Sequence, residues 1–427
     1  MAAQEFAKLP GFRDFPPEEF ARRLHIQSAW RRVARRYGFE EYDAPPLESL
    51  NLYVEKSGEE IVGQLYSFED KGGRPVALRP EMTPSLARML AERSRGLSKP
   101  IRWSSMPQLF RYERAQRGRL REHFQWNVDV VGEAGVPADA EVLAVAIDGL
   151  RELGLTSEDF AARVSDRRLL TALLRAIGVD ESHLPAAYAV IDKMERLPEE
   201  TVDRRFIDDV GLTADQVRVL RETLGASKLE QVVEPFADHE DVMRELEPLR
   251  DHMGILDAMG LGAFVQLDLR IVRGLAYYTG IVFELFDRKG ELRAICGGGR
   301  YDQLLERVGG DPLPAVGFGM GDVVLGELLA DRGLIPIYER GVDYFLIAVT
   351  PSEQAEMLSL AHQLRDWGHS VAYGLRSQAV GKQMKAASRE GARTVVLIGP
   401  DEVARGVVVV RDMASGEQHE TPIGDLR

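Results

Sequence analysis

The segment at 110–129 constrains the fold of this chain more than any other, because it holds a strongly basic loop followed by a strand pattern. Three polar and three apolar residues alternate in its second half: Gln125, Trp126, Asn127, Val128, Asp129 and Val130. Side chains two positions apart lie on one face of a strand, so the pattern predicts one apolar face and one hydrogen-bonding face. An earlier strand near 109–113 and a loop with Arg117, Gly118 and Arg119 at its tip complete an antiparallel hairpin.

The loop of this hairpin is rich in arginine, and its chemistry has two interpretations. Each guanidinium offers a planar fork of donors, which suits the oxygens of a polyphosphate or of a nucleic-acid end. The alternative is a solvated hairpin whose arginines form surface ion pairs, since such pairs are common and contribute little. Composition alone leaves both interpretations open.

Further motifs favour the first interpretation through a family resemblance. The pattern F-R-x-E, followed by a basic loop and a strand that ends in an acid, resembles motif 2 of the class II aminoacyl-tRNA synthetases. Residues 272–284, VRGLAYYTGIVFE, and 296–302, CGGGRYD, resemble the histidine-specific signatures of the histidyl-tRNA synthetase family, and LRPEMT at 78–83 resembles a third. The resemblance runs from Leu9 into the C-terminal part, and only about 170–255 lacks recognisable motifs.

The resemblance implies an α/β protein of two domains, which suits a chain of 427 residues. The first, at 1–335, is an α+β catalytic domain on an antiparallel sheet of class II synthetase type, with a helical insertion at about 170–255. The second, at 341–427, is an α/β anticodon-binding domain, and strands and helices alternate there as in a parallel sheet that ends in VVVVRDM. The class II motifs also imply a homodimer.

The implied activity is the ATP-dependent conversion of L-histidine to histidyl-adenylate, followed by transfer of histidine to the 3′ end of tRNA(His). ATP acts as a substrate with Mg²⁺, and no tightly bound cofactor is expected. The alternative is a synthetase-like regulatory subunit of ATP phosphoribosyltransferase, which predicts an eroded VRGLxYY signature and no anticodon domain. A non-catalytic nucleic-acid binding module would need a basic domain, whereas the net charge of this chain is −14.

The resemblance assigns site residues position by position. Two arginines would face the reacting α-phosphate and act in catalysis: Arg111 and Arg273. Residues that would bind histidine are Glu81, Thr83, Arg111, Gln125, Asp129, Arg273, Tyr277 and Tyr278. Residues that would bind ATP are Arg111, Glu113, Arg119, His123, Phe124 and Arg273. Residues that would bind tRNA are Arg114, Gln116, Arg117 and Arg121. No spacing of His, Cys and Asp indicates a zinc site.

Three departures from the better-known bacterial pattern affect these assignments. Motif 3 usually carries an arginine for the γ-phosphate, whereas this chain has Val324 there, so Arg119 together with Mg²⁺ is our candidate for that role. Ala276 stands where an aspartate is common. The loop ends in REHFQ rather than RQFHQ, so either His123 or Phe124 would stack on adenine. All three variations are similar to a plant-organelle-like branch of the family.

The remaining sequence features concern location. A single cysteine, Cys296, excludes an intrachain disulfide and suits a reducing compartment. No apolar run reaches the ~18 residues that a membrane span needs. The N-terminus has no apolar signal-peptide core. The sequence therefore predicts a cytoplasmic protein without a membrane partner.

Overall fold

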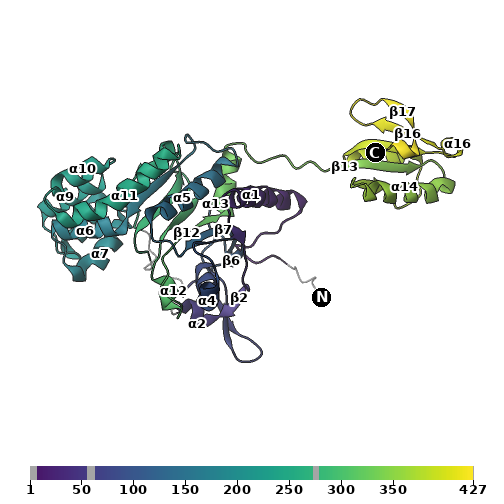
Figure 1. The fold of residues 1–427 in the computed structure, drawn as a ribbon. Helices are drawn as coiled ribbons and strands as arrows, with labels where there is room; N and C mark the ends of the chain where they lie inside the picture. Colours follow the sequence, from purple (N-terminus) through teal and green to yellow (C-terminus); the bar gives the residue numbers. More distant parts are fainter. Residues whose placement is uncertain (1–6, 55–62, 273–277, 427) are drawn as a thin grey trace. The chain divides into compact units, whose positions relative to one another are not determined.

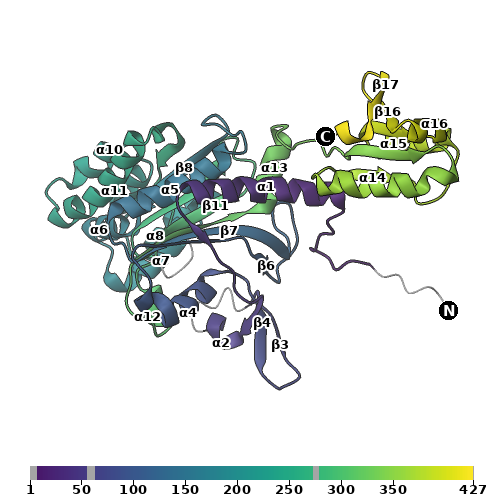
Figure 2. The same cartoon turned by 45° about the vertical axis from the view of Figure 1, so that its right-hand side comes forward.

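The computed structural model describes residues 7–54, 63–272 and 278–426. These form two compact units, Met1–Pro336 and Ile337–Arg427, and each is described by itself (Figures 1 and 2).

A large sheet organises the first unit, and nine strands belong to it within the described residues. Their order is β1-β5-β7-β12-β11-β10-β8-β9, and β6 pairs with β7 beside this path. The bounds are β1 Glu40–Glu41, β5 Ile101–Ser105, β6 Gln108–Phe110, β7 Glu122–Val131, β8 Phe160–Asp166, β9 Val265–Leu267, β10 Ile281–Asp287, β11 Cys296–Arg300 and β12 Ala315–Gly321. The pairings from β5 to β8 are antiparallel, which confirms the predicted sheet type.

The predicted hairpin is present as β6 and β7, which pair with Leu109 opposite His123. Its first strand ends at Phe110, earlier than expected, because the backbone N–H of Tyr112 donates to the carbonyl of Gln64 instead of continuing the ladder. The alternation along β7 is confirmed, since Trp126, Val128 and Val130 are buried in the core.

Helices cover the apolar face of this sheet (Figure 2). They are α1 Pro17–Arg36, α5 Val136–Arg151 and α13 Asp322–Asp331, and α11 Glu240–Ala258 packs on α5. The rings of Trp30 and Trp126 stack with centroids 5.8 Å apart, and a Cβ on Gly149 of α5 would lie 2.4 Å from the Trp126 ring. Glycine is therefore required where α5 crosses β7.

A smaller layer contacts the opposite face of the sheet. It contains the three-stranded sheet of β2 Leu47–Ser49, β4 Pro75–Leu78 and β3 Tyr66–Glu69, with the helices α2 Leu50–Val54, α4 Thr83–Arg93 and α12 Leu304–Arg307. Leu86 and Leu90 of α4 share a core cluster with Val131 and Leu304. This layer leaves part of the polar face of the sheet open.

The described chain between β8 and β9 is helical and packs as one group (Figure 1). Its helices are α6 Arg167–Ile177, α7 Leu184–Ile191, α8 Glu199–Asp208, α9 Ala214–Leu224, α10 Leu229–Val233 and α11. Helix α11 contacts both α6 and α5, so it joins this group to the layer over the sheet. Asp166 begins the group, because its carboxylate accepts the N–H groups of Arg168 and Leu169 as an N-cap.

The second unit holds a five-stranded sheet in the order β14-β13-β15-β16-β17. Its elements are β13 Val342–Ala348, α14 Gln354–Asp366, β14 Val371–Tyr373, α15 Val380–Arg389, β15 Ala392–Ile398, α16 Pro400–Ala404, β16 Val407–Asp412 and β17 Gln418–Pro422. Strand β13 lies parallel to β14 and β15, as predicted. The expected end at β16 is wrong, because β17 adds an antiparallel strand whose sequence QHETP has no apolar alternation. No helix among the described residues of either unit is long and apolar enough to cross a membrane.

Candidate functional site

A pocket of about 830 Å³ lies on the open polar face of the large sheet. Its floor includes Gln125 of β7, Gly319 of β12 and Gly297 of β11. Residues paired across antiparallel strands share a face, and the register places Gly319 opposite both Asn127 and Gly297. The polar face that the alternation predicts is therefore the face that carries the pocket.

Glycines on β12 make room for the polar side chains of β7. A Cβ on Gly317 would lie 2.1 Å from Oδ1 of Asp129, and a Cβ on Gly319 would lie 2.8 Å from the side-chain carbonyl carbon of Gln125. Gly298 of β11 faces the opposite side, where a Cβ would lie 2.6 Å from the Phe283 ring. The close approach of neighbouring strands and side chains thus explains why both strands are rich in glycine.

The hairpin loop supplies two arginines to the pocket wall. Nε of Arg111 donates to the carbonyl of Pro80 at 3.0 Å, which fixes the direction of its guanidinium. Arg119 forms an ion pair with Glu113, and both residues line the pocket. A carboxylate within the same loop therefore partly neutralises Arg119.

A second arginine pair, which sequence reasoning missed, lies at another part of the rim. Arg163 of β8 contacts Glu195 at 3.1 Å, and Arg270 contacts Glu195 at 3.2 Å and Asp268 at 2.7 Å. All of these except Asp268 line the pocket, although they come from distant parts of the chain. The only signal in the sequence is that Arg270 shortly precedes the VRGLAYY segment.

Of the candidate histidine-binding residues that the structure describes, Arg111 and Gln125 line the pocket, whereas Glu81, Thr83, Asp129 and Tyr278 are not part of its lining. Glu81 is buried directly before α4, and Thr83 begins that helix. Tyr278 is buried, and its ring would lie 3.0 Å from a Cβ on Gly299. Arg273 and Tyr277 lie outside the described residues.

Asp129 has an unusual environment for a carboxyl group. Burial raises the pKa of Asp129 to about 7, while a hydrogen bond from the Tyr301 hydroxyl to Oδ1 acts in the opposite direction. Tyr301 belongs to the RYD end of the glycine motif, so the two motifs meet here. A carboxyl group of this kind exchanges its proton near neutral pH.

Of the two aromatic candidates for adenine, the structure brings only His123 into the pocket. Burial, followed by the positive charges of Arg111 and Arg13, lowers the pKa of His123 to about 3, so its ring is neutral near pH 7. Phe124 points to the other side of β7, where its ring meets that of Phe15 at 5.9 Å and the guanidinium of Arg23 at 4.4 Å. Successive side chains of a strand point to opposite faces, so His123 and Phe124 lie on different sides of β7.

Arg13 ties the N-terminal segment to the base of the hairpin, and this contact was also missed. Its guanidinium contacts Glu122 at 2.6 Å and Asp322 at 2.9 Å. Asp322 in turn accepts the backbone N–H of Phe124 at 2.9 Å. The network thereby fixes the part of β7 that carries His123.

The four candidate tRNA contacts on the hairpin loop have different surroundings. Arg114 and Gln116 are exposed. Arg117 is exposed but contacts Glu327 of α13 at 3.1 Å. Arg121 is tied down, since its Nε donates to the carbonyl of Glu113 at 3.0 Å and its guanidinium lies 4.6 Å from the centre of the Tyr112 ring. The geometry of Arg121 is that of a group that shapes the loop.

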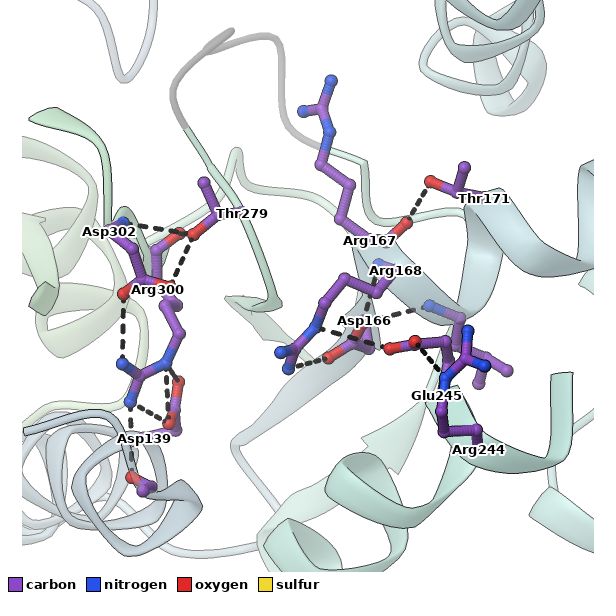
Figure 3. A network of polar contacts seen from close by, with 12 residues as sticks. Asp139, Asp166, Arg167, Arg168, Thr171, Arg244, Glu245, Thr279, Arg300 and Asp302 are labelled. Carbon is purple, nitrogen blue, oxygen red and sulfur yellow. Dashed lines mark hydrogen bonds and ion pairs between the residues drawn. The ribbon is translucent and has the colours of Figure 1, made fainter. Parts of the chain in front are cut away.

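Two polar networks flank the start of β10 (Figure 3). In one, the buried guanidinium of Arg300 contacts Asp139 at 3.0 Å, and the backbone N–H of Thr279 donates to the carbonyl of Arg300 at 2.8 Å. In the other, Arg168 contacts Asp166 at 3.3 Å and Glu245 of α11 at 3.9 Å. A buried ion pair broken on one side costs about 3–5 kcal/mol, so the first network holds the strand that follows Tyr278 firmly in place.

Metal ligands are not gathered in the described part of the chain. No group of three or more His, Cys, Asp or Glu side chains there is arranged to hold a metal ion. Cys296 is buried.

Comparisons with known proteins agree with one another. Residues 11–321 match the family described as histidyl-tRNA synthetase, and residues 343–427 match the anticodon binding domain family. The chain is 45% identical to a histidine–tRNA ligase of Opitutus terrae, over 98% of the chain and 96% of the relative. It is 41% identical to the chloroplastic/mitochondrial histidine–tRNA ligase of Arabidopsis thaliana, over 97% of the chain and 85% of the relative.

Solved structures show the same fold. The histidyl-tRNA synthetase from Nostoc sp. PCC 7120 superimposes with a TM-score of 0.82 at 25% identity, over 98% of this chain and 97% of that one. An ATP phosphoribosyltransferase regulatory subunit/histidyl-tRNA synthetase from Bacillus halodurans has a TM-score of 0.76 at 24% identity, over 93% of this chain and 99% of that one, and shows the fold alone.

Proposed function

The chain belongs to the histidyl-tRNA synthetase family, and from this premise we propose that it activates L-histidine with ATP and transfers it to the 3′ end of tRNA(His). The observation that carries the proposal is the glycine-floored pocket with arginines on its wall, in a chain that is 45% identical to a histidine–tRNA ligase. Relatives with 41–45% identity over nearly the whole chain bear that name, including the plant organelle enzyme of the predicted branch. The regulatory-subunit alternative has no better support.

In the first step, a carboxylate oxygen of histidine attacks the α-phosphorus of ATP. The new P–O bond forms as the bond to the β-phosphate breaks, and pyrophosphate leaves. Negative charge grows on the α-phosphate oxygens, so fixed positive groups lower the barrier. Arg111 is one such group, because its bond to Pro80 orients it in advance. Arg273 is the second by resemblance, and Mg²⁺ bound with ATP would offset the charge of the leaving pyrophosphate.

In the second step, the terminal ribose hydroxyl of tRNA attacks the carbonyl carbon of the adenylate, and AMP leaves. The exposed side chains of the hairpin loop, Arg114, Gln116 and Arg117, are the proposed contacts with the tRNA end. Arg121 is a positioning residue for this loop, because its donors are engaged within it. The domain at 341–427 binds the anticodon through a basic surface of Arg376, Lys382, Lys385, Arg389 and Arg393.

Recognition of histidine needs partners for its polar ring and its α-amino group. Glu81, Thr83, Gln125 and Asp129 hold the amino group and carboxylate, whereas Glu81 and Tyr278 face the imidazole. In the ATP site, His123 stacks on adenine, and the Glu113–Arg119 pair contacts the nucleotide. Phe124 has no part in this proposal, because it packs against Phe15 on the other side of β7.

The catalytic domain at 1–335 works as a homodimer in the cytoplasm. Light scattering at micromolar concentration measures the assembly state directly. A stable monomer would contradict the dimer, which is drawn from the class II motifs.

The test of the function is histidine-dependent exchange of labelled pyrophosphate into ATP, followed by charging of tRNA(His) transcripts. We expect exchange that needs both histidine and Mg²⁺. Arg273→Ala should nearly abolish it while leaving thermal unfolding unchanged. Arg204→Ala, which removes an exposed arginine on α8, is the matched control and should exchange normally. A wild-type protein that binds histidine but exchanges no pyrophosphate at any metal concentration would support the regulatory-subunit alternative instead.

A further inference from the structure

One corner of the pocket joins three segments that are distant in sequence. Arg293 lies between β10 and β11, Gly118 is at the tip of the hairpin loop, and Val324 belongs to the first turn of α13, and all three line the pocket. A Cβ on Gly118 would lie 3.4 Å from Cγ2 of Val324 and 3.8 Å from Cδ of Arg293. The side chains of Val324 and Arg293 therefore approach the same point from different elements.

The charges around the pocket distinguish Arg293 from three other arginines that line it, Arg119, Arg163 and Arg270. Arg119 is ion-paired with Glu113, and Arg163 and Arg270 are ion-paired with Glu195. Within the described residues, no hydrogen bond or ion pair joins Arg293 to another group, and the side chain is exposed. Its guanidinium is thus a positive charge at the pocket whose donors a ligand can use without breaking an existing ion pair.

We propose that Arg293 binds the β- and γ-phosphates of ATP and the pyrophosphate that they become. This inference rests on the proposed function. The proposed function places adenine at His123, which lines the pocket at the base of the hairpin, whereas Arg293 approaches the tip of the same loop at Gly118. A triphosphate that starts from adenine at His123 and passes Arg111 therefore extends toward this corner. A planar guanidinium binds two phosphate oxygens at once, which suits a polyanion.

Val324 lies at the position where the family usually has the arginine for the γ-phosphate, and it borders the same corner as Arg293. An arginine at 324 would extend from α13 into the corner that the aliphatic stem of Arg293 already borders. This chain has the apolar Val324 on α13 and the cation Arg293 on the connection between β10 and β11. In our proposal, Arg293 therefore binds the same phosphates that an arginine at 324 would bind. Arg119, which is paired with Glu113 on the hairpin loop, then makes a separate contact with the nucleotide.

The test is steady-state exchange kinetics of the full-length protein with Arg293→Ala. Loss of a charge-assisted hydrogen bond corresponds to roughly a 10- to 100-fold change in affinity, so the KM values for ATP and for pyrophosphate should both rise by about this factor. The KM for histidine should stay unchanged. Binding of a non-hydrolysable adenylate analogue should also stay unchanged, because the analogue lacks the β- and γ-phosphates. Arg293→Lys should recover part of the loss.

Two further variants separate a phosphate contact from a general disturbance. Lys289→Ala removes an exposed cation from the same connection outside the pocket lining. It should leave the KM values for ATP, pyrophosphate and histidine and the affinity for the adenylate analogue unchanged. In the Arg293→Ala protein, the additional change Val324→Arg should recover affinity for ATP and pyrophosphate. Failure of this recovery would contradict the idea that the two positions serve the same phosphates.

The outcomes also separate this inference from the proposed function. No exchange by the wild-type protein would overturn the proposed function. Normal wild-type exchange with unchanged KM values for ATP and pyrophosphate in Arg293→Ala would overturn only the role of Arg293. An equal loss of adenylate-analogue binding would overturn it too, because the substitution would then act on the whole pocket.

Discussion

The hydrogen bond from Tyr301 to Asp129 leads to a quantitative prediction about pH. Burial raises the pKa of Asp129 to about 7, and the Tyr301 hydroxyl lowers it by stabilising the carboxylate. Removal of that hydroxyl in Tyr301→Phe should therefore raise the pKa further. A hydrogen bond to a charged group contributes about 1.5–3 kcal/mol, which corresponds to a rise of about one to two pH units.

The consequence concerns the affinity for histidine. Only the ionised form of Asp129 attracts the α-ammonium group of the substrate, so the KM for histidine should fall as pH rises through about 7 in the wild-type protein. At pH 7 about half of the Asp129 side chains are ionised in the wild type, and only about 1–10% would be in Tyr301→Phe. The variant should then have a KM about 5- to 50-fold higher at pH 7, and the difference should nearly vanish at high pH.

The assay is pyrophosphate exchange with histidine varied at each pH from 6 to 9.5. The imidazole of the substrate histidine also titrates in this range, but it does so equally in the assays of both proteins. The quantity compared is therefore the difference in pH between the two profiles of KM for histidine. Tyr37→Phe is the matched control, since Tyr37 donates to Asp148 at 2.7 Å between α1 and α5. Identical profiles for the wild type and Tyr301→Phe would refute the reasoning about Asp129.

Three further predictions follow from the structure. Arg119→Ala should raise the KM for ATP more than that for histidine in the exchange assay, and an unchanged dependence on ATP would remove Arg119 from the phosphate site. A chain that ends after Gly333 should keep some histidine activation and lose most tRNA charging, whereas full charging would contradict the anticodon-domain assignment. Burial lowers the pKa of His252 to about 3, so the unfolded chain binds one more proton between pH 3 and about 6.5, and the free energy of unfolding should fall as pH drops below 6.5. His252→Leu should remove about 2 kcal/mol of that loss at pH 5, measured by urea unfolding at pH 5 and 7.5.

Local periodicity was sufficient to predict the strand that organises the site. The alternation along β7 predicted an apolar and a polar face, and the structure places Trp126, Val128 and Val130 in the core and Gln125 in the pocket lining. It could also have decided between His123 and Phe124, because Gln125 shares a face with His123. Periodicity is less decisive along α1, where Phe20 and Leu24 are 39% and 40% exposed although they are apolar, while Trp30 is fully buried.

Local periodicity could not predict features that depend on contacts between segments distant in the sequence. Strand β12 is rich in glycine, which has a low strand propensity, and its conformation follows from pairing with β7 and β11 rather than from its own residues. Arg293 and Arg163 carry no motif, and their place at the pocket depends on how β8, β10 and β11 assemble. Strand β17 forms at the edge of its sheet, where polar residues are tolerated.

Strand β7 has a consequence for how this enzyme can vary. Substitutions at its even-numbered positions from 126 to 130 change the packing against Trp30 and α5. Substitutions at 123 and 125 change the lining of the pocket, and those at 127 and 129 change buried polar side chains on the same face of the strand. The two sets of side chains point in opposite directions, so selection can tune substrate preference along one set without loosening the protein interior. A library that randomises only the odd positions should therefore yield mostly folded proteins with altered ligands, and one that randomises the even positions should yield mostly unfolded ones.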